Sequence, residues 1–216
     1  MVLNSGYFTD SSHDEEGKMS YRIPATSVLA LSLLTGSRTV AQAPPSPAVL
    51  IAAQRDAMRP LARMDGVWRG DAWTILRSGE RHAITQTERI GPFLDGSIKG
   101  VEGRGYDADG KVSFNAFGVI SYDPATKAYT LHSYAQGRAG DFPLVPNADG
   151  YVWEIPAGPM KIRYTAVIKP DAWREIGEYI SAGKDPVQFF EMNLKKVGET
   201  VWPAAGAIPM TGTIIP

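Results

Sequence analysis

The sequence predicts an all-β fold, an antiparallel up-and-down barrel of about eight or more strands with one short N-terminal helix. After Trp68, apolar and polar residues alternate with period two over most of the chain, as strands require. Short turn sequences rich in Gly, Asp, Asn and Pro separate these segments. Helical spacing is confined to one stretch before the first strand. A two-sheet sandwich is the alternative, because alternation does not show whether a sheet closes.

The N-terminal segment has the parts of a secretory signal peptide. In residues 19–43, Arg22 supplies positive charge, residues 28–34 form an apolar core and Ala-Gln-Ala at 41–43 forms a cleavage site. The apolar run is too short to span a bilayer. We therefore expect a periplasmic or secreted protein that is not inserted in a membrane after cleavage. Residues 1–18 are interpreted as a mis-assigned start or a disordered extension.

The remaining chain has the size of one domain. Residues 44–48 form a Pro-rich spacer, and 49–216 are expected to form a single β-barrel domain. Without any Cys, this domain must take its stability from its core. Residues 44–216 carry nineteen acidic and nineteen basic residues. This balance, without basic clusters, argues against nucleic acids and anionic membrane surfaces as partners.

The predicted helix should cover one end of the barrel. Its apolar residues recur at helical spacing, and Pro60 should kink or end it because proline lacks the N–H that a helical turn needs. These apolar residues are Leu50, Ala53, Ala57, Leu61 and Met64. Gly66 then lets the backbone turn into the first strand, and Trp68 is expected to plug the barrel there.

Eight segments have the alternation of strands: 68–76, 81–90, 93–106, 111–122, 128–136, 151–155, 159–168 and 187–197. Turn chemistry occupies 77–80, 107–110, 123–127 and 147–150. The segment 170–186 is interpreted as a long loop that forms a lid at the barrel mouth. An apolar cluster on the outside, around Trp173, is the alternative for that segment. The tail from Trp202 is expected to pack across the outside.

Three motifs carry a resemblance to a known family. They are Leu61-x-x-Met64-x-Gly66-x-Trp68-x-Gly70, Gly118-x-Ile120-x-Tyr122-Asp123-Pro124-Ala125-Thr126-Lys127-x-Tyr129, and Phe189-Phe190-Glu191-Met192-x-Leu194-x-Lys196. With them the chain resembles an uncharacterised family of exported bacterial proteins with a lipocalin-like (calycin-type) β-barrel. The resemblance covers most of residues 44–216 and implies the fold. It brings over no catalytic residues, because the family has no settled activity.

Two strand faces carry the polar residues that a binding pocket would use. One face holds His82, Ile84, Gln86 and Glu88; the other holds Thr130, His132, Tyr134 and Gln136. Each face either lines the interior or forms outer surface. The candidate catalytic residues are His82, His132 and Tyr134. The candidate ligand-binding residues are Trp73, Gln86, Glu88, Arg104, Asn115, Trp153 and Tyr164.

These residues lead to two functional hypotheses. The first is a periplasmic barrel that binds a small apolar or aromatic molecule. The alternative is a cofactor-free lyase or isomerase acting on a small aromatic substrate, in which His82 or His132 moves a proton while Tyr134, Gln86 or Arg104 stabilises negative charge.

Other chemistry is not expected from the sequence. The two His residues after position 43 are not closely spaced, so neither a metal nor a cofactor is predicted. The sequence shows no nucleophile elbow, phosphate loop, dinucleotide fingerprint or recognisable Ser/His/Asp order. Covalent hydrolysis and nucleotide-dependent reactions are therefore not expected, and a homo-oligomer is left open.

Overall fold

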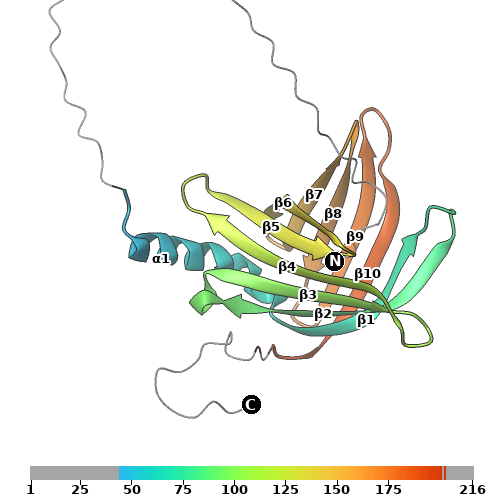
Figure 1. Ribbon diagram of the computed structural model, residues 1–216, viewed down its shortest axis with the longest axis horizontal. Helices are drawn as coiled ribbons and strands as arrows, with labels where there is room; N and C mark the ends of the chain where they lie inside the picture. Colours follow the sequence, from blue (N-terminus) through green and yellow to red (C-terminus); the bar gives the residue numbers. More distant parts are fainter. Residues whose placement is uncertain (1–43, 201, 203–216) are drawn as a thin grey trace, which may run out of the picture.

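The computed structural model describes residues 44–200 and Trp202. The expected extension (1–18), the expected signal peptide (19–43) and most of the C-terminal tail lie outside the described residues. The described chain forms a closed antiparallel barrel in the order β1-β10-β9-β8-β7-β6-β5-β4-β3-β2 (Figure 1). Sequence neighbours pair throughout, and β1 pairs with β10 to close the sheet. The predicted up-and-down barrel is confirmed, and the sandwich alternative is wrong.

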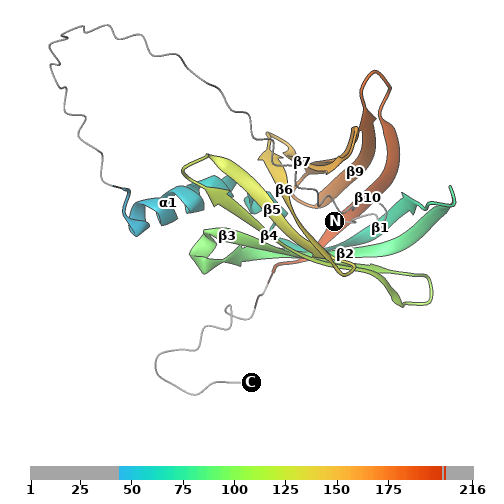
Figure 2. The same cartoon turned by 45° about the horizontal axis from the view of Figure 1, so that its top comes forward.

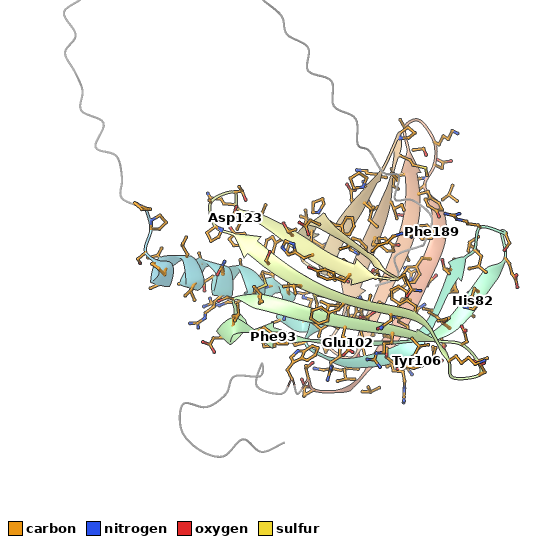
Figure 3. All side chains as sticks on the ribbon, viewed as in Figure 1. His82, Phe93, Glu102, Tyr106, Asp123 and Phe189 are labelled. Carbon is orange, nitrogen blue, oxygen red and sulfur yellow. The ribbon has the colours of Figure 1, made fainter. Side chains whose placement is uncertain are left out.

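The barrel has ten strands in the described residues. They are β1 (Gly66–Ile75), β2 (Arg81–Phe93), β3 (Ile98–Tyr106), β4 (Val112–Asp123), β5 (Ala128–Ala135), β6 (Arg138–Pro146), β7 (Gly150–Ala157), β8 (Met160–Ile168), β9 (Ala172–Ser181) and β10 (Val187–Gly198). Burial alternates along them, so successive side chains point into and out of the barrel (Figure 3). The inward set forms one continuous hydrophobic core.

Two of these strands were not predicted from the sequence. β6 contains Gly140 and Pro143, which weaken the strand signal, and only Leu144–Pro146 of this strand pairs with β7. β9 occupies the segment expected to be a lid, which is a correction: Ala172–Ser181 pairs with both β8 and β10. Its alternation was hidden because the inward set Trp173, Glu175 and Gly177 includes a charged residue and a glycine.

The N-terminal helix lies against one end of the barrel (Figures 1 and 2). α1 (Pro47–Met58) begins inside the expected spacer and continues into the 3-10 helix η1 (Arg59–Met64), so the α-helix ends just before Pro60 as predicted. The hydroxyl of Tyr129 donates to the carbonyl of Ala57 at 2.7 Å, which ties α1 to β5. No helix in the described part of the chain is long and apolar enough to cross a membrane.

Trp68 closes the barrel beside η1, as expected. Its side chain is fully buried, its indole N–H donates to the carbonyl of Met64 at 2.9 Å, and its ring meets Trp173 edge-on at 5.8 Å. Gly66 has φ +141°, a conformation that L side chains rarely adopt, so it supplies the sharp entry into β1. Of the C-terminal tail, Trp202 stacks on the outer surface of β2, 4.1 Å from the Arg89 guanidinium.

Candidate ligand-binding site in the barrel interior

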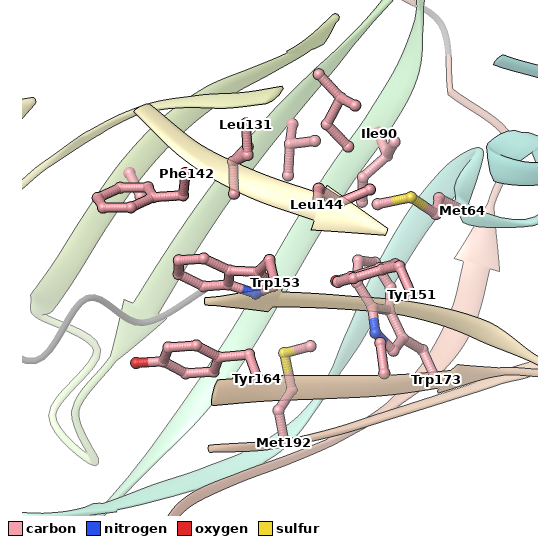
Figure 4. Packing of buried hydrophobic residues seen from close by; sticks show 14 of the residues in the cluster. Met64, Ile90, Leu131, Phe142, Leu144, Tyr151, Trp153, Tyr164, Trp173 and Met192 are labelled. Atoms are coloured by element: carbon pink, nitrogen blue, oxygen red, sulfur yellow. The ribbon is translucent and has the colours of Figure 1, made fainter. Parts of the chain in front are cut away.

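An aromatic wall lines the interior where β7 and β8 pair. Trp153 and Tyr164 lie directly opposite each other in the register, and their rings stack at 4.3 Å between centroids with 6° between planes. Phe142 from β6 tilts against Trp153 at 5.7 Å (Figure 4). Cross-strand pairing on a single face therefore stacks two large aromatic rings inside the barrel.

A buried carboxyl group lies beside this wall. Glu175 on β9 is fully buried, and it accepts hydrogen bonds from the Tyr151 hydroxyl and, at 3.5 Å, from the Trp153 indole N–H. The sequence reasoning missed Glu175 because it fell in the segment taken for a loop. The signal that could have found it is the period-two sequence from Trp173 to Gly177.

A second polar pair faces the interior from β2. Gln86 and Glu88 are both fully or almost fully buried, and the Gln86 side-chain N–H donates to Glu88 Oε1 at 2.7 Å. Because a carboxylate only accepts, this bond places Nε2 toward Glu88 and leaves Oε1 of Gln86 as the remaining acceptor. That oxygen has no hydrogen-bond partner among the described residues.

Glycines on β3 make room for this pair. A Cβ atom at Gly103 would lie 2.8 Å from Glu88 Oε1, and one at Gly105 would lie 3.3 Å from Gln86 Oε1. Both distances are shorter than ordinary van der Waals contact. The absence of side chains at these two positions thus allows the two polar groups of β2 to lie flat against β3.

Burial and neighbouring charges shift the pKa values of the acidic groups in this part of the interior. Burial raises the pKa of Glu175, and the nearby Glu88 charge acts in the same direction, whereas the hydrogen bonds from Tyr151 and Trp153 oppose the shift. Burial, together with the charge of Glu175, holds the pKa of the Tyr151 hydroxyl well above its usual range. The phenol therefore stays protonated and donates. Since Glu88 influences both groups, the β2 pair and the Glu175 cluster share one region of the interior.

Two further observations concern charge and polarity inside. Lys99, the buried cation among the described residues, pairs with Asp65, so it does not neutralise Glu88 or Glu175 by direct contact.

On β5, the Ser133 hydroxyl is buried without a hydrogen-bond partner in the described part of the chain. Buried polar atoms are normally paired, so Gln86 Oε1 and Ser133 Oγ are among the atoms that a guest or an ordered water would satisfy.

His82 lies on the inward-facing side of β2, near the hairpin that joins β1 and β2 and far along the strand from Trp68 (Figure 3). Its Nε2 atom is 3.1 Å from Asp107 Oδ1, and its side chain is 38% exposed. A histidine held by a carboxylate is therefore present at this rim of the barrel, apart from the buried polar cluster.

Five of the predicted site residues face outward, so they do not line the barrel interior. They are Trp73, Arg104, Asn115, His132 and Tyr134. Trp73 lies under the Arg81 guanidinium at 4.3 Å, Arg104 pairs with Glu102 at 3.0 Å, and Tyr134 is 58% exposed.

Period two shows which residues share a face but not which face is inside. On β5 the inward face has the small set Leu131, Ser133 and Ala135, while the polar and aromatic side chains lie outside. Of the predicted site residues, the structure brings Gln86, Glu88, Trp153 and Tyr164 into the interior and places His82 at its rim.

No protein-family model and no curated protein sequence matches this chain. Among solved structures, the chain is similar to the crystal structure of Rv2717c from M. tuberculosis, with a TM-score of 0.49 and 11% identity over 65% of this chain and 96% of that one. It is also similar to the S-type phycobiliprotein lyase CPES from Guillardia theta, with a TM-score of 0.45 and 11% identity over 70% of this chain and 98% of that one. At this level of identity neither similarity bears on function.

Proposed function

We propose that the barrel interior binds a small, largely apolar aromatic molecule that carries at least one hydrogen-bond donor. The observation that carries this proposal is the Trp153–Tyr164 stack in the same interior as Gln86 Oε1, an acceptor without a partner among residues 44–200 and Trp202. The aromatic side chains suit an apolar aromatic guest, and the oxygen suits an N–H or O–H group on that guest.

The guest needs a hydrogen-bond donor because the interior holds an unpaired acceptor and two acidic side chains. Leaving a buried acceptor unpaired costs about 1–3 kcal/mol, and a guest that donates to it recovers that free energy. The side chains of Glu88 and Glu175 place acidic groups in a poorly solvated region, where an additional negative charge is costly. A neutral or cationic guest is favoured there, and an anionic one is disfavoured.

The proposed location of this binding protein is the periplasm or the extracellular space. The support is the signal-peptide pattern of residues 19–43 in the sequence. Fractionation of cells expressing the full chain tests it: the mature protein should appear in the periplasmic or secreted fraction and should begin near residue 44. Recovery of the uncleaved chain in the cytosol would contradict the location without affecting the binding proposal.

The binding proposal is tested with two aromatic probes of opposite character. Neutral 1-aminoanthracene has an amine donor, whereas 1-anilinonaphthalene-8-sulfonate carries a negative charge. Tight binding of the first and weak binding of the second are expected, with Gln86→Leu weakening 1-aminoanthracene about tenfold.

The control for this titration is Thr85→Val on the exposed outer face of the same strand, which should leave affinity unchanged. Failure of both probes to bind, or equal binding by wild type and Gln86→Leu, would count against the proposal. Native mass spectrometry of the purified protein then identifies any guest retained from the cell.

The lyase or isomerase alternative is favoured by one specific observation. Glu175 is a buried carboxyl whose pKa is raised by burial, beside Tyr151 and Glu88. A carboxyl group whose pKa is raised keeps its proton to higher pH than a free carboxyl group and can serve as a proton donor and acceptor. In this version Glu175 does the proton transfer that the sequence assigned to His82 or His132. His132 lies outside the barrel, and His82 lies at its rim.

Deuterium exchange tests the enzyme alternative. A guest extracted from the protein is returned to it in D₂O, and its mass is followed. Incorporation of deuterium at carbon with wild type, and its loss in Glu175→Gln, would support catalysis. A guest that binds without any exchange would leave binding as the function.

A further inference from the structure

Three side chains on the outer surface form a hydrogen-bonded relay across consecutive strands. His132 Nε2 lies 2.9 Å from the Ser121 hydroxyl on β4, and His132 Nδ1 lies 2.7 Å from Asp141 Oδ1 on β6. The register explains the geometry, because His132 is directly opposite Asp141. On the other side His132 is opposite Val119, which makes Ser121 its diagonal neighbour.

The proton positions follow from the chemistry of the partners. The Asp141 carboxylate can only accept, so Nδ1 of His132 carries the proton that is donated to it. In the neutral imidazole Nε2 then carries a lone pair, and it accepts a hydrogen bond from the Ser121 hydroxyl. The serine proton is therefore already directed at a base that a carboxylate orients, which is how serine nucleophiles are activated.

An apolar groove begins two strands away from Ser121, at Pro143 on β6. Thr130 is directly opposite Ser121, and Pro143 is directly opposite Thr130. Pro143 begins the lining of a groove of about 630 Å³ that continues to Val145, which is 63% exposed. An apolar group attached to an ester bond at Ser121 would have this groove to lie in.

We infer that Ser121 is the nucleophile of an esterase-type acyl-transfer site for small esters with an apolar acyl group. Ser121 Oγ bonds to the ester carbonyl carbon while His132 takes its proton. The ester C–O bond then breaks, and His132 returns the proton to the leaving alcohol. Water, deprotonated by His132, attacks the acyl-serine and releases the carboxylic acid and the free hydroxyl.

The surface position sets the expected rate. Asp141 has a side chain that is 70% exposed, so solvent screens its effect on His132. The backbone N–H groups of these strands serve the sheet ladder, and Thr130, directly opposite Ser121, is the residue placed to offer a hydroxyl to the developing oxyanion. We therefore expect slow turnover but clear covalent labelling of Ser121. This activity is independent of the interior binding site.

An uncharged alkyl fluorophosphonate probe tests the site, with peptide mass mapping of the labelled residue. The label should appear on Ser121, and His132→Gln should slow labelling about 10²-fold. Hydrolysis of p-nitrophenyl butyrate should be lost in Ser121→Ala and retained in Ser113→Ala, an exposed serine on the same strand.

Thermal melting of each variant separates a structural role from a chemical one. If the relay is only structural, the variants melt lower while Ser121 reacts no faster than Ser113. That result, or labelling of Ser121 at the wild-type rate in His132→Gln, would overturn the inference. Loss of labelling in a His132→Gln protein that melts like wild type would support it.

Discussion

Trp68 and Trp73 lie five residues apart on one strand and have opposite environments. Trp68 is completely buried and donates to the backbone of Met64, whereas Trp73 is half-buried on the outer face under Arg81. The odd spacing puts the two side chains on opposite faces of β1. At the scale of one residue, burial rather than residue type decides what each tryptophan contributes to stability.

We expect Trp68→Ala to lower the free energy of unfolding by about 3–5 kcal/mol, the range for truncating a buried Trp. For a domain of this size that corresponds to a melting temperature roughly 6–20 °C lower. Trp73→Ala, the matched control, should cost about 1 kcal/mol or less because it loses mainly an exposed cation–π contact. Equal melting temperatures for the two variants would show that Trp68 does not plug the barrel.

The raised pKa of Glu175 predicts a pH dependence of stability. Because the native state keeps this proton to higher pH than the unfolded chain, the native state binds more protons above the ordinary value of 4.5. The free energy of unfolding therefore falls as pH rises from there through the native pKa. Glu175→Gln should flatten this slope, as measured by urea unfolding between pH 4 and pH 9.

The control for that series is Glu178→Gln, which changes a residue of the opposite, outward-facing set on the same strand. It should keep the wild-type pH slope. If Glu175→Gln also keeps the wild-type slope, then Glu175 is not a buried group with a raised pKa.

At the scale of the element, the glycines of β3 leave space for side chains of the neighbouring strand β2. Gly103 and Gly105 face inward and leave the space that Glu88 and Gln86 from β2 occupy. This arrangement is visible in the sequence as glycines at period two, but their role follows only from the register of β2 and β3. Glycine in a strand interior often marks such a close approach.

Gly103→Ala should weaken the binding of 1-aminoanthracene. The new Cβ would lie 2.8 Å from Glu88 Oε1, so the carboxylate must move and Gln86, which is hydrogen-bonded to it, moves with it. We expect a several-fold loss in affinity, measured by fluorescence titration. Gly198→Ala, where a Cβ meets nothing within 4 Å, should bind like wild type. Unchanged affinity in Gly103→Ala would show that the position of Glu88 does not affect the binding site.

The sequence predicted most elements because local patterns determine them. Alternation and turn chemistry identified eight of the ten described strands, and Pro60 marked the end of α1. β9 was missed because Glu175 and Gly177 occupy inward positions where apolar residues are expected. Glu175 is itself part of the proposed site, and functional sites are where such local rules are broken. β6 was missed because Pro143 and Gly140 reduce its strand propensity.

At the scale of the whole molecule, closure of the barrel decides which faces are inside. Period two assigned His132 and Tyr134 to a common face correctly, but only the closed order of strands shows that this face is outside. The relay of Ser121, His132 and Asp141 was missed for the same reason. Its members come from three strands, and no local spacing rule brings a diagonal neighbour and an opposite neighbour together.

The whole barrel therefore offers two surfaces with different chemistry. Inside, aromatic rings and buried acceptors suit a guest with a donor group. Outside, a serine, a histidine and an aspartate form a relay, and an apolar groove begins at Pro143 on β6. The proposed binding function depends on the first surface alone.

A crystal structure of the protein with 1-aminoanthracene tests that function most directly. We expect the aromatic rings to lie against Trp153 and Tyr164, with the amine within hydrogen-bond distance of Gln86 Oε1. The probe should be absent from the same crystals of the Gln86→Leu variant at equal concentration. A probe found only in the outer groove beside Pro143, with the interior unchanged, would contradict the proposal that the barrel is a binding site.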